Sequence, residues 1–170
     1  MKQIISTQEA PAAIGAYSQA VIANGMLFAS GQLGIDPATG EFAGADFRSQ
    51  AEQAVKNVAA ILKAANTDAS HVIKTTVFLT DMANFAVLNE VYSTLFAAPF
   101  PARSAVAVAA LPKGGLVEIE VIEWGSSRLS MEKLSDRRGY SHCRQMYAAL
   151  LEQSRHRNTA NTKKSGWFRR

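Results

Sequence analysis

Two segments of this chain repeat their apolar residues with the period of an α-helix, and the segments around them are typical of β-strands. In the first, residues 47–66, alanine, valine, isoleucine and leucine recur at i, i+3, i+4 and i+7. Between the two, residues 71–80 (HVIKTTVFLT) are rich in β-branched residues, which predicts a central strand. The second, residues 81–96, begins at Asp81 and predicts a helix whose apolar side carries Phe85, Leu88, Val91, Tyr92 and Leu95.

Further strands are predicted on both sides of this helix–strand–helix unit, at residues 2–6, 17–23, 26–31, 103–111 and 116–124. This order predicts an α+β fold in which a mostly antiparallel or mixed sheet carries both helices on one face. No helix is left to cover the other face, so we expect another subunit to cover it and the protein to be an oligomer.

The charge of the chain is divided between two segments that we expect to be different in kind. Residues 1–123 hold 7 Lys/Arg against 11 Asp/Glu, a net charge of −4, whereas residues 124–170 hold 11 against 3, a net charge of +8. We therefore predict one domain at 1–123 and a basic C-terminal extension at 124–170, disordered or with one helix at 143–153. A cloning-derived or frame-shifted end, a native extension that binds RNA or anionic surfaces, and an oligomer-stabilising helix all stay open for it.

Several classes of protein lose their usual sequence support. No run of about 18 apolar residues occurs, and the first 15 residues lack the apolar core of a signal peptide, so we expect a cytoplasmic protein without a membrane span. A single cysteine and three scattered histidines predict neither a disulfide framework nor a zinc site. Phosphate-binding glycine loops and the serine-hydrolase motif GxSxG are also absent from the sequence.

Arg103 is the least expected residue, because it opens the apolar segment RSAVAV shortly after two prolines, Pro99 and Pro101. A partly buried guanidinium is costly unless an anion pairs with it. If 103–111 and 116–124 form a hairpin around PKGG, that anion is a carboxylate of the same sheet. In the functional interpretation Arg103 binds a carboxylate ligand, Ala105 leaves room beside it, and Glu118 activates a water. Both interpretations stay open on spacing alone.

Three other residues are weaker candidates for ligand contact. Tyr17 faces a ligand or merely begins a strand, and Gly31 lets a ligand approach the backbone or only relaxes a turn. Asn89, in a mostly apolar helix, touches a ligand or lies on the helix surface.

Five segments, in order across residues 1–122, together resemble one family, the reactive-intermediate deaminases of the RidA/YjgF type. They are APAAIGAYSQAV, FASGQLGIDPATGE, QAEQAVKNVAAILKAA, VIKTTVFLTDMANFAVLNEVY and FPARSAVAVAALPKGGLVEIEVI. The resemblance implies a sheet backed by two helices and a homotrimer around a central barrel, with clefts between subunits. It implies hydrolysis of enamines and imines, such as 2-aminoacrylate and 2-iminobutanoate, to 2-oxo acids and ammonia, without cofactor or metal.

Residue by residue, the resemblance makes Arg103 the clamp for the substrate carboxylate and Glu118 the residue that positions water. Gly31 and Asn89 would contact the substrate or shape the pocket, and Tyr17 would line it from a neighbouring subunit. The chain departs from the family pattern at Ala16, commonly proline, and at Ala105, often cysteine, where a change in substrate size preference is expected. The alternatives are an RNA-acting protein, of the endoribonuclease or translation-inhibitor type, and a ligand-binding scaffold without turnover.

Overall fold

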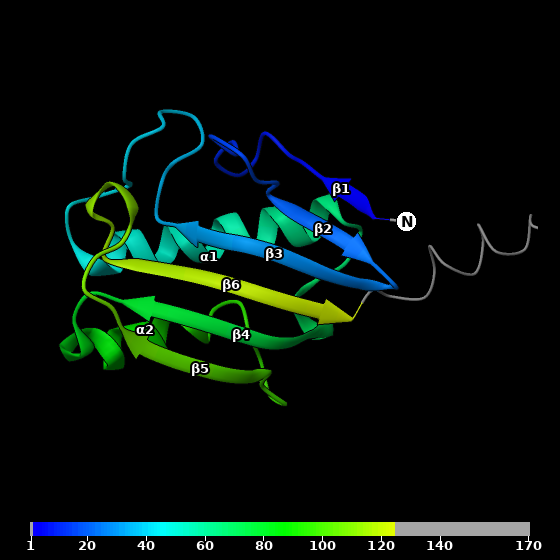
Figure 1. Cartoon of the computed structure of the whole chain (residues 1–170). Coiled ribbons are helices and arrows are strands. Elements are labelled where there is room, and N and C mark those ends of the chain that lie inside the picture. Colours follow the sequence, from blue (N-terminus) through cyan, green and yellow to red (C-terminus); the bar gives the residue numbers. More distant parts are fainter. Residues whose placement is uncertain (1, 125–170) are drawn as a thin grey trace, which may run out of the picture. The chain divides into compact units, whose positions relative to one another are not determined.

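The computed structural model describes residues 2–124, and the predictions made for residues 125–170 lie outside this range. Six strands form one sheet in the order β1-β2-β3-β6-β4-β5. Their bounds are Gln3–Ile5 (β1), Ala20–Ala23 (β2), Met26–Leu33 (β3), Val72–Leu79 (β4), Ala102–Ala107 (β5) and Val117–Trp124 (β6). Every neighbouring pair is antiparallel except β4 and β5, which are parallel. Both helices lie behind the sheet in Figure 1, which confirms the predicted α+β fold with a mixed sheet and helices on one face.

The hairpin considered for the last two strands is not formed, because β4 lies between β5 and β6. The nine residues that join β5 to β6 exceed the two to five of a usual hairpin loop, and they contain the 3₁₀ helix η3 (Pro112–Gly114). β4 is an interior strand that hydrogen-bonds along both edges, and its alternate residues Thr75, Val77 and Leu79 are fully buried.

Helix α1 (Phe47–Ala64) follows the predicted segment closely. Asp46 caps its start by accepting a hydrogen bond from the backbone N–H of Ser49. The helix ends two residues earlier than expected, because Asn66 adopts the left-handed backbone conformation, with φ of 57°. Its apolar stripe packs on the sheet.

Helix α2 (Phe85–Tyr92) is shorter than the predicted 81–96. Asp81 caps a separate 3₁₀ turn, η2 (Met82–Asn84), so the expected N-terminal turn is not α-helical. At the other end, the hydroxyls of Ser93 and Thr94 donate to carbonyls of the last turn, and these bonds compete with continuation of the helix.

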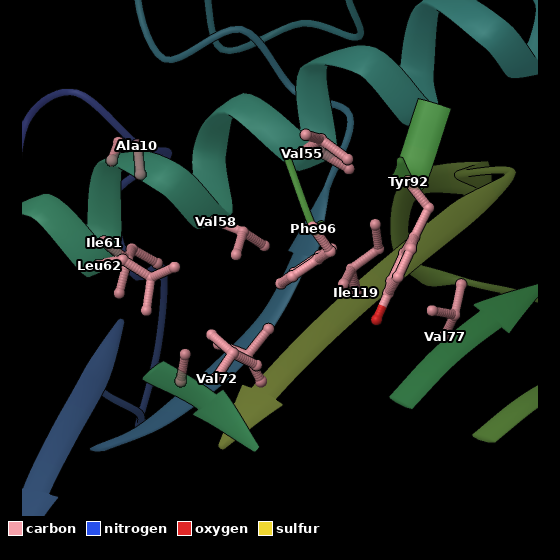
Figure 2. Close-up of a cluster of buried hydrophobic side chains, with 14 of the residues drawn as sticks. Ala10, Val55, Val58, Ile61, Leu62, Val72, Val77, Tyr92, Phe96 and Ile119 are labelled. Carbon is pink, nitrogen blue, oxygen red and sulfur yellow. The ribbon is translucent and has the colours of Figure 1, made fainter. Parts of the chain in front are cut away.

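The core fills the space between the sheet and the two helices. Figure 2 shows Val58, Ile61 and Leu62 of α1 facing this layer, with Phe96 and Ile119 among the side chains that complete it. Both Ile119 and Leu88 are fully buried, and truncating such a residue to alanine usually costs about 2–5 kcal/mol.

The opposite face of the sheet carries no helix in the part of the chain described. Side chains paired across the strands share a face, so the register fixes its members. We call this surface the open face; it comprises Val21, Phe28, Lys74, Thr76, Phe78, Ser104, Val106, Glu118, Glu120 and Ile122. Phe28 and Val106 are each 44% exposed there, so the open face presents apolar side chains to its surroundings. Among the helices of residues 2–124, none has the length and apolarity to cross a membrane.

Candidate active site

A pocket of about 740 Å³ lies beside the C-terminal half of β3. Its walls are the loop before β2, the loop after β3, the turn η3 and one side chain of β6. The lining is mostly apolar, and its polar residues are Tyr17, Gln19, Ser30, Gln32, Lys113 and Glu118. Small-molecule sites usually combine apolar walls with a few polar groups in this way.

Gly31 lies directly against the carboxyl group of Glu118. The register of β3 and β6 shifts between Ala29 and Gln32, which brings the Gly31 backbone toward the side chain of Glu118. An ideal Cβ at Gly31 would lie 1.9 Å from Oε1 of Glu118, closer than any real contact. The carboxyl group therefore occupies space that only glycine leaves open.

Burial, and then repulsion from Glu120, raises the pKa of Glu118 above that of an ordinary glutamate. The two carboxylates are neighbours because they lie two residues apart on β6, on the same face. A carboxylate with a raised pKa is a stronger base than an ordinary glutamate, and a pKa that lies nearer to neutral pH suits a group that has both to accept a proton and to return it.

The loop that carries Tyr17 is tied to the sheet by the buried amide of Gln19, which is only 3% exposed. The Oε1 atom of Gln19 accepts from the backbone N–H of Thr7 at 2.7 Å. Its Nε2 atom donates to the carbonyls of Thr7, Ala10 and Pro11. Gln19 thus holds the pocket wall in place, while Tyr17 itself stays 53% exposed.

Arg103 lies in a second group of residues, built around helix α2. Its Nη2 atom donates a hydrogen bond of 2.7 Å to Oδ1 of Asn89. Its guanidinium carbon lies over the rings of Tyr92, at 4.7 Å from the centroid, and Phe85, at 5.4 Å. Within residues 2–124 the ion pairs are Arg48–Glu90, Lys63–Glu9 and His71–Asp68, and none of them includes Arg103. The ion pair considered from the sequence is therefore not formed in this range.

Arg103 and Glu118 belong to opposite faces of the same sheet. Arg103 pairs with Thr75, and Thr75 pairs with Val121, in a row that faces the helices. Glu118 instead pairs with Phe78 in a row on the open face. The structure thus brings Tyr17, Gly31 and Glu118 together in one group, and Asn89, Arg103 and Ala105 lie in the other.

Sequence reasoning missed the residues that hold these two groups in place. Tyr92 is buried on the apolar side of its helix, as predicted, but its place beside Arg103 is not predicted, although Phe85, Asn89 and Tyr92 are spaced i, i+4, i+7 on one side of a helix. Gln19 interrupts an apolar strand, and that interruption was the available sign of a buried polar contact. No group of three or more His, Cys, Asp or Glu side chains in the described residues is arranged to hold a metal ion.

Comparison with known proteins gives consistent matches over the described domain. Residues 7–123 match the family model described as Endoribonuclease L-PSP. RutC family protein y4sK of Sinorhizobium fredii is 55% identical over 122 residues, which cover 72% of this chain and 97% of that protein. The 2-iminobutanoate/2-iminopropanoate deaminase of Rattus norvegicus is 50% identical, with 72% and 89% covered. The crystal structure of RidA from an Antarctic Psychrobacter species superposes with a TM-score of 0.69 at 52% identity, covering 72% of this chain and 98% of that one.

Proposed function

The chain belongs to the Endoribonuclease L-PSP family, which includes the RidA/YjgF proteins, and from this membership we propose that it hydrolyses reactive 2-imino and 2-enamino acids to 2-oxo acids and ammonia. The observation that carries the proposal is a guanidinium, Arg103, held by neutral partners and without an acidic one in residues 2–124. Relatives about 50% identical carry the name of this deaminase.

We propose that two copies of the chain build each site. Arg103 and Glu118 face opposite sides of one sheet, so a substrate small enough to touch both must lie between the Glu118 group of one copy and the Arg103 group of another. The apolar members of the open face supply a surface for such an assembly. The homotrimer implied by the family resemblance satisfies this requirement, with three equivalent sites.

In this site Arg103 binds the substrate carboxylate through two of its remaining N–H groups, because a guanidinium matches a carboxylate bidentately. The imine carbon is already electrophilic, so the protein has mainly to orient it beside a water molecule. Asn89 fixes the guanidinium, and the small side chain of Ala105 leaves space beside it.

Glu118 moves the protons of the reaction. Its carboxylate takes a proton from water while the water oxygen bonds to the carbon of the protonated imine, and the C=N electron pair moves to nitrogen. The protonated Glu118 then donates to that nitrogen, and the C–N bond breaks. The hydroxyl oxygen forms the new C=O bond as its proton passes to the Glu118 carboxylate, which then releases it to solvent. One water is consumed and one ammonia released, with no net oxidation. An enamine first takes a proton at its β-carbon to become the imine.

The experiment that tests this proposal is a 2-iminobutanoate hydrolysis assay on the Arg103→Ala variant. Loss of two charge-assisted hydrogen bonds, each worth about 1.5–3 kcal/mol, predicts a fall in kcat/KM of about 10²–10⁴-fold in a folded protein. Arg48→Ala is the matched control, because it removes an exposed arginine paired with Glu90 on the surface. Full activity of Arg103→Ala would refute the proposal.

We assign this activity to residues 1–123, the predicted deaminase domain, since the family match ends at residue 123. A chain that ends at Trp124, where β6 ends, should therefore hydrolyse 2-iminobutanoate as fast as the full chain. A large loss of activity in the folded shorter chain would instead give residues 125–170 a part in the site.

Cleavage of RNA is the second candidate, favoured by the description of the family model as an endoribonuclease. The charge of the domain opposes it, because residues 1–123 carry a net charge of −4, and RNA binding depends on clustered cations. An RNA-cleavage assay on the chain ending at Trp124 distinguishes the two candidates.

A further inference from the structure

The guanidinium of Arg103 lies on a platform made by one side of helix α2. The rings of Phe85 and Tyr92 lie under it, and Oδ1 of Asn89 accepts one of its N–H groups. These three residues are spaced i, i+4, i+7 along α2, so the helix presents them together. Of the three, Tyr92 lies closest, with its ring centroid 4.7 Å from the guanidinium carbon.

Tyr92 is held in place by two contacts besides the one with Arg103. It is 4% exposed, and its hydroxyl shares a 2.9 Å hydrogen bond with the Oγ1 atom of the fully buried Thr75. Its ring also packs on Phe96, with centroids 4.3 Å apart and planes inclined at 30°. Figure 2 shows Tyr92 descending from α2 beside Ile119.

The residue that anchors Tyr92 is also the strand partner of Arg103. Thr75 of β4 and Arg103 of β5 are opposite each other in the parallel ladder. The backbone of Arg103 and the ring beneath its guanidinium are therefore both positioned by Thr75. This closed arrangement restricts where the end of a long, flexible side chain can lie.

We infer that Tyr92, anchored by Thr75, is a positioning residue that holds the Arg103 guanidinium ready for a substrate carboxylate; this rests on the proposed function. An aromatic ring attracts a cation through its quadrupole, so it holds the guanidinium without neutralising its charge. It also accepts none of the in-plane N–H groups, which stay available for bidentate binding. A carboxylate in place of Tyr92 would have taken those groups itself.

A purely structural role for Tyr92 makes a different prediction. A core position needs only apolar volume, and leucine or phenylalanine supplies that without burying a hydroxyl. The matched control is Phe96→Leu: Phe96 is 1% exposed, packs on the same ring and comes from the same segment, but its ring does not lie under Arg103. Both leucine variants disturb the core, but only Tyr92→Leu removes a ring from beneath the Arg103 guanidinium.

The experiment compares Tyr92→Leu, Tyr92→Phe, Phe96→Leu and Arg103→Ala in the full-length protein. For each we measure kcat and KM for 2-iminobutanoate and the inhibition constant of 2-oxobutanoate, the carboxylate product. Tyr92→Leu should raise KM and the inhibition constant about 10-fold and change kcat less than 3-fold. Tyr92→Phe keeps the ring and loses only the hydrogen bond to Thr75, so KM and the inhibition constant should rise about 2-fold to 3-fold. Phe96→Leu should lower Tm and leave both constants unchanged.

The outcomes separate this inference from the proposed function. If Arg103→Ala abolishes activity and Tyr92→Leu behaves as Phe96→Leu does, Tyr92 is only a core residue and the inference is wrong. If Arg103→Ala stays active, the proposed function itself fails. If Tyr92→Leu does not fold, the test uses Phe85→Leu and Tyr92→Phe instead, because Phe85 supplies the other ring under the guanidinium. Unchanged constants in both of those variants would equally overturn the inference.

Discussion

The carboxyl group of Glu118 occupies the space where any side chain at Gly31 would begin. An ideal Cβ at Gly31 would lie 1.9 Å from Oε1 and 2.5 Å from Cδ of Glu118. The two residues come from β3 and β6, which pair through an irregular register at this point. The choice of glycine at position 31 is therefore linked to the position of the proposed proton-transferring group.

Gly31→Ala should leave the protein folded and displace the carboxyl group of Glu118 from the pocket. Because a misplacement of about 1 Å at a reacting group can cost about 10²-fold in rate, we expect kcat/KM for 2-iminobutanoate to fall by about that factor. Gly40→Ala is the control, because Gly40 lines the same pocket and has open space where a Cβ would lie. Its φ of +76° is a backbone conformation that alanine adopts only at a cost. Gly40→Ala should lose stability, of order 1 kcal/mol, and keep activity. Full activity of Gly31→Ala together with a large loss of activity in Gly40→Ala would contradict this account.

The pH profile of kcat/KM should respond to Glu120, which does not have to touch the substrate. In the proposed mechanism Glu118 is a base when ionised, so activity should fall as the pH drops through its pKa. Burial and repulsion from Glu120 both raise that pKa. Glu120→Gln removes the repulsion and should shift the acidic limb of the profile to lower pH. If the acidic limb of Glu120→Gln lies at the same pH as that of the unmodified protein, either Glu118 is not the base or Glu120 does not raise its pKa.

Glu123 offers a test of pH-dependent stability away from the pocket. It is 1% exposed, its burial raises its pKa, and its Oε1 accepts a hydrogen bond from Thr67. A glutamate in the unfolded chain loses its proton near about pH 4.3, whereas Glu123 in the folded protein keeps its proton to higher pH. Glu123 therefore lowers the free energy of unfolding as the pH rises through its two pKa values, and this loss persists at higher pH.

Glu123→Gln can still accept from Thr67 and never ionises. It should therefore raise Tm relative to the unmodified protein at pH 7, and the difference should vanish below about pH 4. Thermal melts at both pH values, with the exposed Glu41→Gln as control, measure this. A gain that persists unchanged at pH 4 would mean that ionisation of Glu123 is not its cause.

The elements of the fold could be predicted because their patterns are local. The period of residues 47–66 defines α1 apart from its last turn, where the left-handed Asn66 ends the helix. The neighbours of β5 could not be predicted in this way, because strand order depends on contacts distant in sequence. RSAVAV and VEIEV look suitable for a hairpin, yet β4 separates them.

The sequence identifies candidate residues for the site, but it does not reveal how the fold groups them. Arg103 is the one charged residue of β5, whereas Glu118 is one of three glutamates of β6. The register that sends Arg103 and Glu118 to opposite faces is set by β4, which lies between their strands. Tyr92 and Gln19 act through contacts with Thr75 and with the segment 7–11, which no spacing along the chain reveals.

Activity in mixed assemblies of two inactive variants tests the composite site most directly. Arg103→Ala and Glu118→Gln each destroy one half of every site, so each alone should be inactive in the 2-iminobutanoate assay. If a site takes Arg103 from one copy and Glu118 from another, random mixing of equal amounts leaves about one quarter of sites with both residues intact. Co-expressed variants should therefore recover about a quarter of the unmodified activity. A mixture as inactive as its components would contradict the shared site.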